Sequence, residues 1–131
     1  MAITLADAER IVQAGNKKAA EMGIKVTIAV VDPRGDLVLL SRMDGSPWRS
    51  LAISQGKAHA SAEFGVPSAE LSARAAMPVM QAVVQIKGGV FVPQQGAVPI
   101  KQGDKVVGAV GVSGASSEDD EVVALAGVAA L

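Results

Sequence analysis

The chain contains no cysteine and no tyrosine, and only one tryptophan and two phenylalanines in 131 residues. The lack of cysteine excludes disulfides and thiolate metal sites. So few aromatic rings do not make a platform on which nucleic-acid bases stack, and a net charge of −1 with scattered basic residues gives no stripe that follows a phosphate backbone. The composition therefore argues against disulfide-stapled and nucleic-acid-binding proteins.

Long hydrophobic runs are absent as well. The N-terminal stretch MAITLADAER lacks the basic-then-apolar layout of a signal peptide, and no apolar run approaches about 18 residues. We therefore expect a cytoplasmic protein with no membrane partner. A length of 131 residues lies in the range of one domain, so residues 1–131 are predicted to form a single domain.

Hydrophobic residues make up 50% of the chain, and most of them are alanine and valine. Such small side chains predict a closely packed core. The mean hydropathy of +0.35 is high for a small domain whose surface should be mostly polar. We therefore expect apolar surface to be buried between identical subunits, which predicts a homo-oligomer.

The most distinctive stretch is the glycine-rich segment Lys105–Ser113, which alternates as a strand. One predicted face carries Val106, Gly108, Val110 and Val112, and the other carries Val107, Ala109, Gly111 and Ser113. Glycine inside a strand forfeits packing and costs backbone entropy, so its repetition indicates a close approach to this strand. The approaching group is either a tightly packed helix or another backbone or ligand.

The other predicted elements have local signals of their own. Thr4 and Gly23 delimit an amphipathic helix, and an antiparallel hairpin of Lys25–Asp32 and Leu37–Met43 follows, with turn residues between the strands. Helices are then predicted from Ser46 to about Phe64, from Ser68 through Arg74, and over Pro78–Lys87, although the last pattern also fits a strand. Short strands follow at Val90–Val92 and Val98–Lys101. Ser117 with Asp120 resembles the capping box of a last helix. This order predicts an α+β fold in which helices pack on a five-stranded, mostly antiparallel sheet.

Acidic residues gather at two places where backbone chemistry explains them. Residues 118–121 are all acidic and fall on the first turn of the last helix, where carboxylates meet free N–H groups; a cation site is the alternative. Asp32 and Asp36 flank a tight turn, where aspartate commonly bonds its own backbone. We expect both sets to be structural.

His59 is the only histidine, so a metal site with several ligands would need carboxylates or a second subunit. A lone helical histidine is usually structural or at the surface. Its functional interpretation is axial ligation of haem iron, which needs a single imidazole.

Lys57, Arg42 and Arg49 are the basic residues that we consider for an anion-binding cleft. Lys57 lies in the same predicted helix as His59, and its alternatives are a lysine that reaches from the helix surface into solvent or a desolvated amine with chemistry of its own. Arg49 stands at a helix start, against the dipole preference, which favours a negative partner nearby. The turn that begins with Ser113 and Gly114 presents free N–H groups, a generic anion site.

Three segments together carry a family resemblance. They resemble parts of the GlcG/HbpS family, which includes the C-terminal domain of PduO proteins. The family's C-terminal signature is similar to VPIKQGDKVVGAVGVSGASSEDDEVVALAG, its first hairpin to VTIAVVDPRGDLVLLSRMDG, and its central helix to GKAHASAEFGVPS. The resemblance implies a profilin-like fold and a homo-oligomer that binds a small molecule, haem or a corrinoid among them. A small-molecule lyase, isomerase or hydrolase acting on a carboxylate-bearing substrate is the alternative function.

The resemblance also bears on the choice between Lys57 and His59, which lie about 200° apart on a helix and should not line one pocket. Lys57 matches the lysine of the family's central helix, whereas His59 falls on a variable position of that motif. Ala60 and Ser61 replace the threonine and alanine that usually follow. We therefore expect Lys57 to grip an anionic ligand and keep His59 as the haem-ligand hypothesis.

Overall fold

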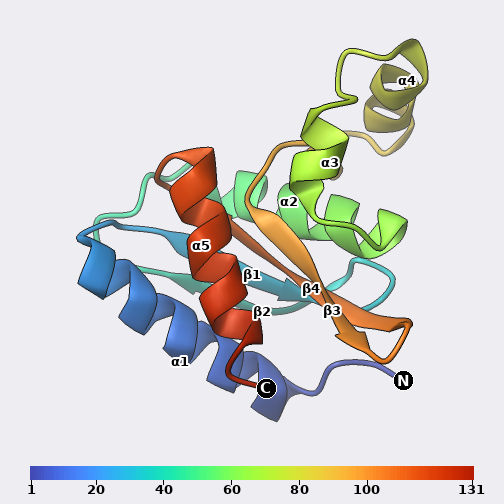
Figure 1. The fold of residues 1–131 in the computed structure, drawn as a ribbon. Helices are drawn as coiled ribbons and strands as arrows, with labels where there is room; N and C mark the ends of the chain where they lie inside the picture. The colour runs from blue at the N-terminus through green and yellow to red at the C-terminus, as the bar shows by residue number, and fades with distance from the viewer.

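A four-stranded antiparallel sheet with helices on both faces forms the body of the protein in the computed structural model, which describes residues 1–131 (Figure 1). The elements are α1 (Leu5–Met22), β1 (Thr27–Val31), β2 (Leu37–Arg42), α2 (Ser50–Phe64), α3 (Ser68–Ser72), α4 (Pro78–Ile86), β3 (Ala97–Gln102), β4 (Lys105–Ser113) and α5 (Ser117–Val128). The predicted α+β class is confirmed.

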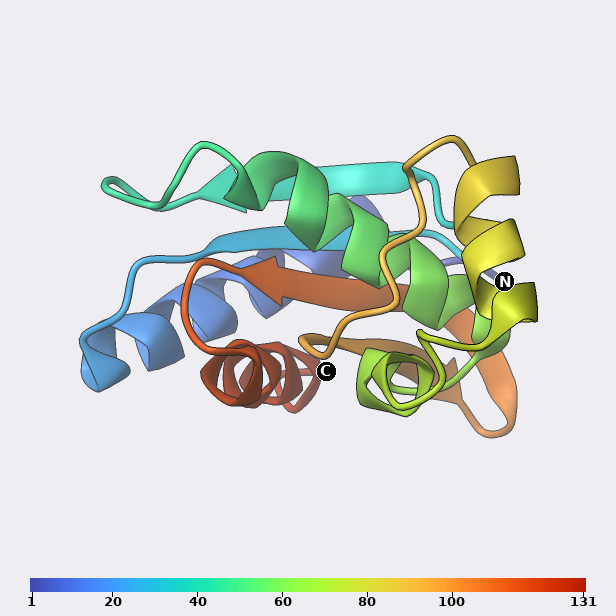
Figure 2. The same cartoon turned by 90° about the horizontal axis from the view of Figure 1, so that it is seen from above.

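The strand order is β2-β1-β4-β3, and every neighbouring pair is antiparallel. All residues of β1 are buried, as expected for a central strand covered on both faces. The predicted fifth strand over Val90–Val92 is wrong. The Val92 amide donates to the Gly56 carbonyl of α2 at 3.1 Å, so this segment crosses the helix and does not join the sheet (Figure 2).

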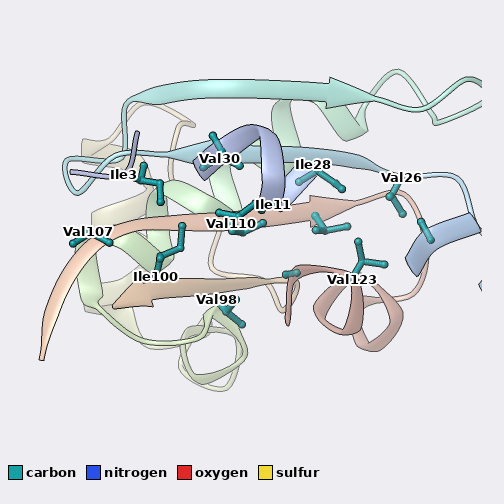
Figure 3. Close-up of a cluster of buried hydrophobic side chains, with 14 residues drawn as sticks. Ile3, Ile11, Val26, Ile28, Val30, Val98, Ile100, Val107, Val110 and Val123 are labelled. Carbon is teal, nitrogen blue, oxygen red and sulfur yellow. The ribbon is translucent and has the colours of Figure 1, made fainter. Parts of the chain in front are cut away.

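The two faces of the sheet have different cores. Valine and isoleucine side chains fill the space between the sheet and the helices α1 and α5, where Ile11, Ile28, Val110 and Val123 come together (Figure 3). Facing α2, the buried cluster is Ala29, Val31, Ala58, Ala62 and Ala109. The small residues on the second face let α2 lie very close to the strands.

Gly111 marks the point of closest approach. A Cβ at this position would lie 2.2 Å from the Ser54 carbonyl oxygen and 2.7 Å from the Ala58 amide nitrogen. The predicted close approach is thus confirmed, and the approaching group is the backbone of α2. The strict alternation is wrong at one residue: Val107 packs with Val110 in the larger core, because the pairing register shifts by a bulge opposite Ile100 and Lys101.

Helix ends mostly follow the sequence signals. Thr4 caps α1, Gly23 closes it in the left-handed region, and Pro78–Ile86 is helical as favoured. The cap of α5 is Ser116, whose hydroxyl accepts from the Asp119 amide, and not the predicted Ser117. No helix is both long and apolar enough to cross a membrane.

Candidate functional site

A groove of about 350 Å³ lies between α2 and the end of the sheet where β1 turns into β2. The turn between β1 and β2, through Gly35 and Asp36, forms one wall, and Gly89 and Val90 form the other. His59 lies in its lining. We call it the His59 groove.

The imidazole of His59 is held at one nitrogen and unbonded at the other. Nδ1 lies 3.2 Å from the Gly35 carbonyl oxygen, and Nε2 is enclosed without a hydrogen-bond partner. Glu63 Oε2 is 3.4 Å from Nε2, which is ion-pair distance for a protonated ring but lacks hydrogen-bond alignment. With the proton on Nδ1 donated to the carbonyl, Nε2 keeps its lone pair, the arrangement found in metal-binding histidines.

Gly35 makes this contact with His59 feasible. Its φ is +86°, and a Cβ there would lie 2.2 Å from His59 Nδ1. Glycine is therefore needed both for the turn and for the approach of its carbonyl to the ring. On the other side of the imidazole, Glu63 also binds Lys87 Nζ at 3.1 Å, which joins the end of α2 to the residue after α4.

Lys57 occupies a closed site on the opposite side of α2. Its side chain is only 3% exposed, and Nζ donates to the Val112 carbonyl at 3.0 Å and to Asp120 Oδ2 at 3.1 Å. This placement differs from the expected open cleft, because an internal carboxylate already meets the ammonium charge. Lys57 lines none of the cavities.

Asp120 is the carboxylate of this pair and lies in the predicted acidic cluster. Its Oδ1 accepts from the Ala115 amide at 2.9 Å, which ties the start of α5 to the preceding turn. Burial raises the pKa of Asp120 above its ordinary value of 3.8, although the Lys57 charge and the Ala115 hydrogen bond act in the opposite direction. The desolvation cost of the buried carboxylate therefore outweighs its favourable contacts.

Gly96 lets the lysine reach α5. A Cβ at Gly96, where φ is +137°, would lie 2.7 Å from Lys57 Nζ and 2.8 Å from the Val112 carbonyl oxygen. The Gly96 carbonyl also accepts from the Val112 amide at 3.0 Å. Any side chain at this position would displace the ammonium from the end of β4.

The other predicted anion-binding residues meet at a second, smaller hollow. Arg49, Ser113 and Gly114 all line a space of about 90 Å³ between the starts of α2 and α5. Arg42 stands apart from this lining, and its guanidinium donates to the Ser46 carbonyl at 3.1 Å. Asp32 is structural as expected, since its Oδ1 accepts from the amides of Arg34 and Asp36.

A third cavity, of about 460 Å³, lies between α1, β3 and the end of α5. Asp7 and Arg10 are in its lining, and they pair with each other. Although this cavity has the largest volume, Asp7 and Arg10 already meet each other's charge, and Lys101 is the remaining charged side chain in the lining. No group of three or more His, Asp or Glu side chains is arranged to hold a metal ion.

Comparison with known proteins places this geometry in a family. The family model described as haem degrading protein HbpS-like matches residues 3–129. The chain belongs to the HbpS-like family. The predicted GlcG/HbpS relationship is therefore confirmed over nearly the whole length.

Named relatives agree with the HbpS-like assignment. Protein GlcG of Escherichia coli K12 is 33% identical over 111 residues, which cover 81% of this chain and 77% of GlcG. A double mutant of Streptomyces reticuli HbpS superposes with a TM-score of 0.89 at 30% identity, covering 100% of this chain and 88% of that one. A PduOC–haem complex, at 22% identity, shares the fold with a TM-score of 0.90 and covers 100% and 96%.

The residues of this HbpS-like chain fit haem at one point. His59 offers an imidazole whose Nδ1 is held by a backbone carbonyl and whose Nε2 has no hydrogen bond, a donor suited to axial ligation. Nε2 is enclosed beside Glu63, so a ligand reaches it only after the Glu63 side chain turns away. Glu63 is 38% exposed, and turning it away also breaks its ion pair with Lys87.

Sequence reasoning missed the residues that surround Lys57 and His59. Asp120 was assigned to a helix cap, and no local pattern joins it to Lys57, which is 63 positions away. Glu63 had a signal, because it lies four residues after His59 on the same helix, where side chains meet. Gly35 and Gly96 lie in turns, and nothing in the local sequence indicates that His59 and Lys57 approach them.

Proposed function

We propose that the protein is a homo-oligomeric binding protein whose His59 groove takes haem or a related tetrapyrrole such as a corrinoid. The observation that carries the proposal is the His59 imidazole, oriented by the Gly35 carbonyl and unbonded at Nε2, beside a groove of about 350 Å³. That volume is within the usual range of small-molecule sites, roughly 300–1,000 Å³.

Two further features support this ligand class. Leu37 and Val90, both in the groove lining, are 47% and 53% exposed, which provides apolar surface for a flat ring system. Among proteins of the same fold, HbpS is a member of the matched haem-related family and PduOC was solved with haem. When bound, haem would supply an iron centre that accepts the imidazole.

Homo-oligomerisation is proposed from the arm formed by α3 and α4, which projects from the body (Figure 1). Large apolar side chains are exposed on and next to α4: Met77 at 48%, Val79 at 64% and Ile86 at 81%. A second copy packed on this arm would remove them from water. Sedimentation velocity should show a species well above 13.2 kDa, and Val79→Lys with Ile86→Lys should reduce its size. A wild-type protein that sediments only as the monomer would contradict the proposal.

The alternative enzyme relied on Lys57 to grip a carboxylate-bearing substrate. Its ammonium is enclosed by Asp120 and Val112 and lines none of the cavities. This arrangement favours the binding function over the catalytic one.

Titration of the purified apo protein with hemin tests the function. We expect a saturable change in the Soret band with the spectrum of an imidazole-ligated iron, and we expect His59→Ala to lose that spectrum. Gln55→Ala is the matched control, because Gln55 lines the same groove but bonds only to the Leu51 carbonyl of its own helix. An unchanged spectrum and affinity in His59→Ala would contradict the assignment.

A further inference from the structure

The hollow between the starts of α2 and α5 has the features of a separate binding site. It lies at the end of β4 and away from His59, and its lining is almost entirely polar or backbone: Pro47, Arg49, Ser50, Ser113, Gly114 and Ala115. Its volume of about 90 Å³ corresponds to roughly three water molecules. That space accommodates one small polar group and not an extended molecule.

Two helices direct their N-terminal ends at this hollow. Arg49 is the cap residue of α2 and gives it no side-chain hydrogen bond, while Gly114 and Ala115 immediately precede the Ser116 cap of α5. In Figure 2 the end of β4 lies between the two helix starts. The amides of Arg49 and Gly114 donate no hydrogen bond within the chain. Both helix dipoles and both free amides therefore favour a negative group.

Ser113 supplies an independent observation. The residue is 7% exposed, and its hydroxyl makes no hydrogen bond within the chain, although Ser113 lies in the lining. The side-chain polar atoms that are fully buried without a hydrogen-bond partner are Asn16 Oδ1 and His59 Nε2. The Ser113 hydroxyl is not one of them, so it keeps some accessible surface. Because Ser113 lines the hollow and its hydroxyl has no partner within the protein, the hydroxyl is available to donate to a ligand oxygen there.

The charged residues around the hollow also favour the binding of a negative group. Arg49 is exposed and has no carboxylate within ion-pair distance, unlike Lys57 and Lys87. Asp120 bonds Ala115 through one oxygen and Lys57 through the other, so both of its oxygens are engaged. Glu118 and Asp119 of the first turn of α5 do not line the space. The cation of Arg49 is thus available to an incoming anion.

We propose that this hollow binds a small oxyanion, the phosphoryl or carboxylate group of a metabolite, through the Arg49 guanidinium, the Ser113 hydroxyl and the free amides of Arg49 and Gly114. The rest of such a metabolite extends into solvent past Arg49. The site is independent of the His59 groove, so it stands whether or not haem binds.

The position of Trp48 gives a direct readout of binding. It is the only tryptophan, it is 76% exposed, and it is adjacent to Arg49. Titration with inorganic phosphate and, separately, with acetate at constant ionic strength should change its fluorescence saturably for at least one anion. The Gly114 amide resonance should shift over the same concentrations. A response to phosphate alone assigns a phosphoryl group, and a response to acetate alone assigns a carboxylate.

Variants decide whether the named groups bind the anion. Arg49→Gln should weaken binding by roughly tenfold or more, the loss expected for a charged hydrogen bond. Arg34→Gln, an exposed arginine on the β1–β2 turn, is the matched control and should bind like the wild type. Ser113→Ala should weaken binding without lowering the melting temperature, because its hydroxyl has no partner in the free protein. The proposal is overturned if neither anion produces a saturable response, or if Arg49→Gln binds as tightly as Arg34→Gln.

Discussion

On one side of α2, Lys57 is sealed against β4 and α5 with its charge met by Asp120, whereas on the other side His59 borders an open groove with an unbonded nitrogen. Both residues come from one short stretch of helix, about 200° apart around its axis. The difference shows that a charged residue in a helix motif can serve the packing of the fold, while its less conspicuous neighbour faces the available space.

The Lys57 side of α2, which is packed against the sheet, should be more sensitive to added side-chain volume than the His59 side. Gly111→Val would push side-chain atoms into the backbone of α2 at Ser54 and Ala58, which cannot move aside as a flexible side chain would. We expect a loss of more than about 4 kcal/mol in the free energy of unfolding, at the upper end of overpacking effects. Urea unfolding measures it, with Gln102→Val on the exposed end of β3 as the control. A loss below about 1 kcal/mol would show that α2 is not tightly seated.

Breaking the buried pair on the same side should cost nearly as much. Lys57→Met leaves Asp120 buried without its cation, which we expect to destabilise the fold by about 3–5 kcal/mol. The double variant Lys57→Met with Asp120→Leu should recover much of that loss, since two apolar side chains do not need each other's charge. If the losses in unfolding free energy of Lys57→Met alone and of Asp120→Leu alone simply add in the double variant, the ion pair does not couple α2 to α5.

The raised pKa of Asp120 gives the closed side a pH dependence with a definite sign. The folded protein binds this proton more tightly than the unfolded chain does, so the Asp120 contribution to stability is fully present below its ordinary pKa of 3.8 and is lost as pH rises through the folded-state pKa. The unfolding free energy of the wild type minus that of Asp120→Asn should therefore fall as pH rises above 3.8. A difference that grows with pH would reverse the sign of the shift.

Local signals in the sequence predicted much of the fold. Thr4 and Gly23 delimit α1 because caps depend on residues next to the helix ends. Glycine in β4 predicted the close approach at Gly111, and the structure shows that the approaching group is the backbone of α2. The Val90–Val92 segment has strand-like residues, but its pairing with Gly56 of α2 depends on tertiary structure that no local pattern records.

For the candidate sites, too, local signals could be read from the sequence and tertiary contacts could not. Arg49, Ser113 and Gly114 were expected near an anion from helix-end chemistry, and the fold brings them around one hollow. Lys57 was expected in an open cleft, and the carboxylate that encloses it comes from a helix 63 positions away. The chemical character of a residue is readable from its neighbours in sequence, but its exposure depends on the packing of distant elements.

Hemin affinity, measured side by side in His59→Ala and in the Lys57→Met, Asp120→Leu double variant, tests the separation of the two sides of α2 most directly. We predict that His59→Ala stays folded and loses the imidazole-ligated Soret spectrum. The double variant should bind hemin with the wild-type spectrum. Loss of binding in the folded double variant, with normal binding in His59→Ala, would contradict this assignment and return the ligand site to Lys57.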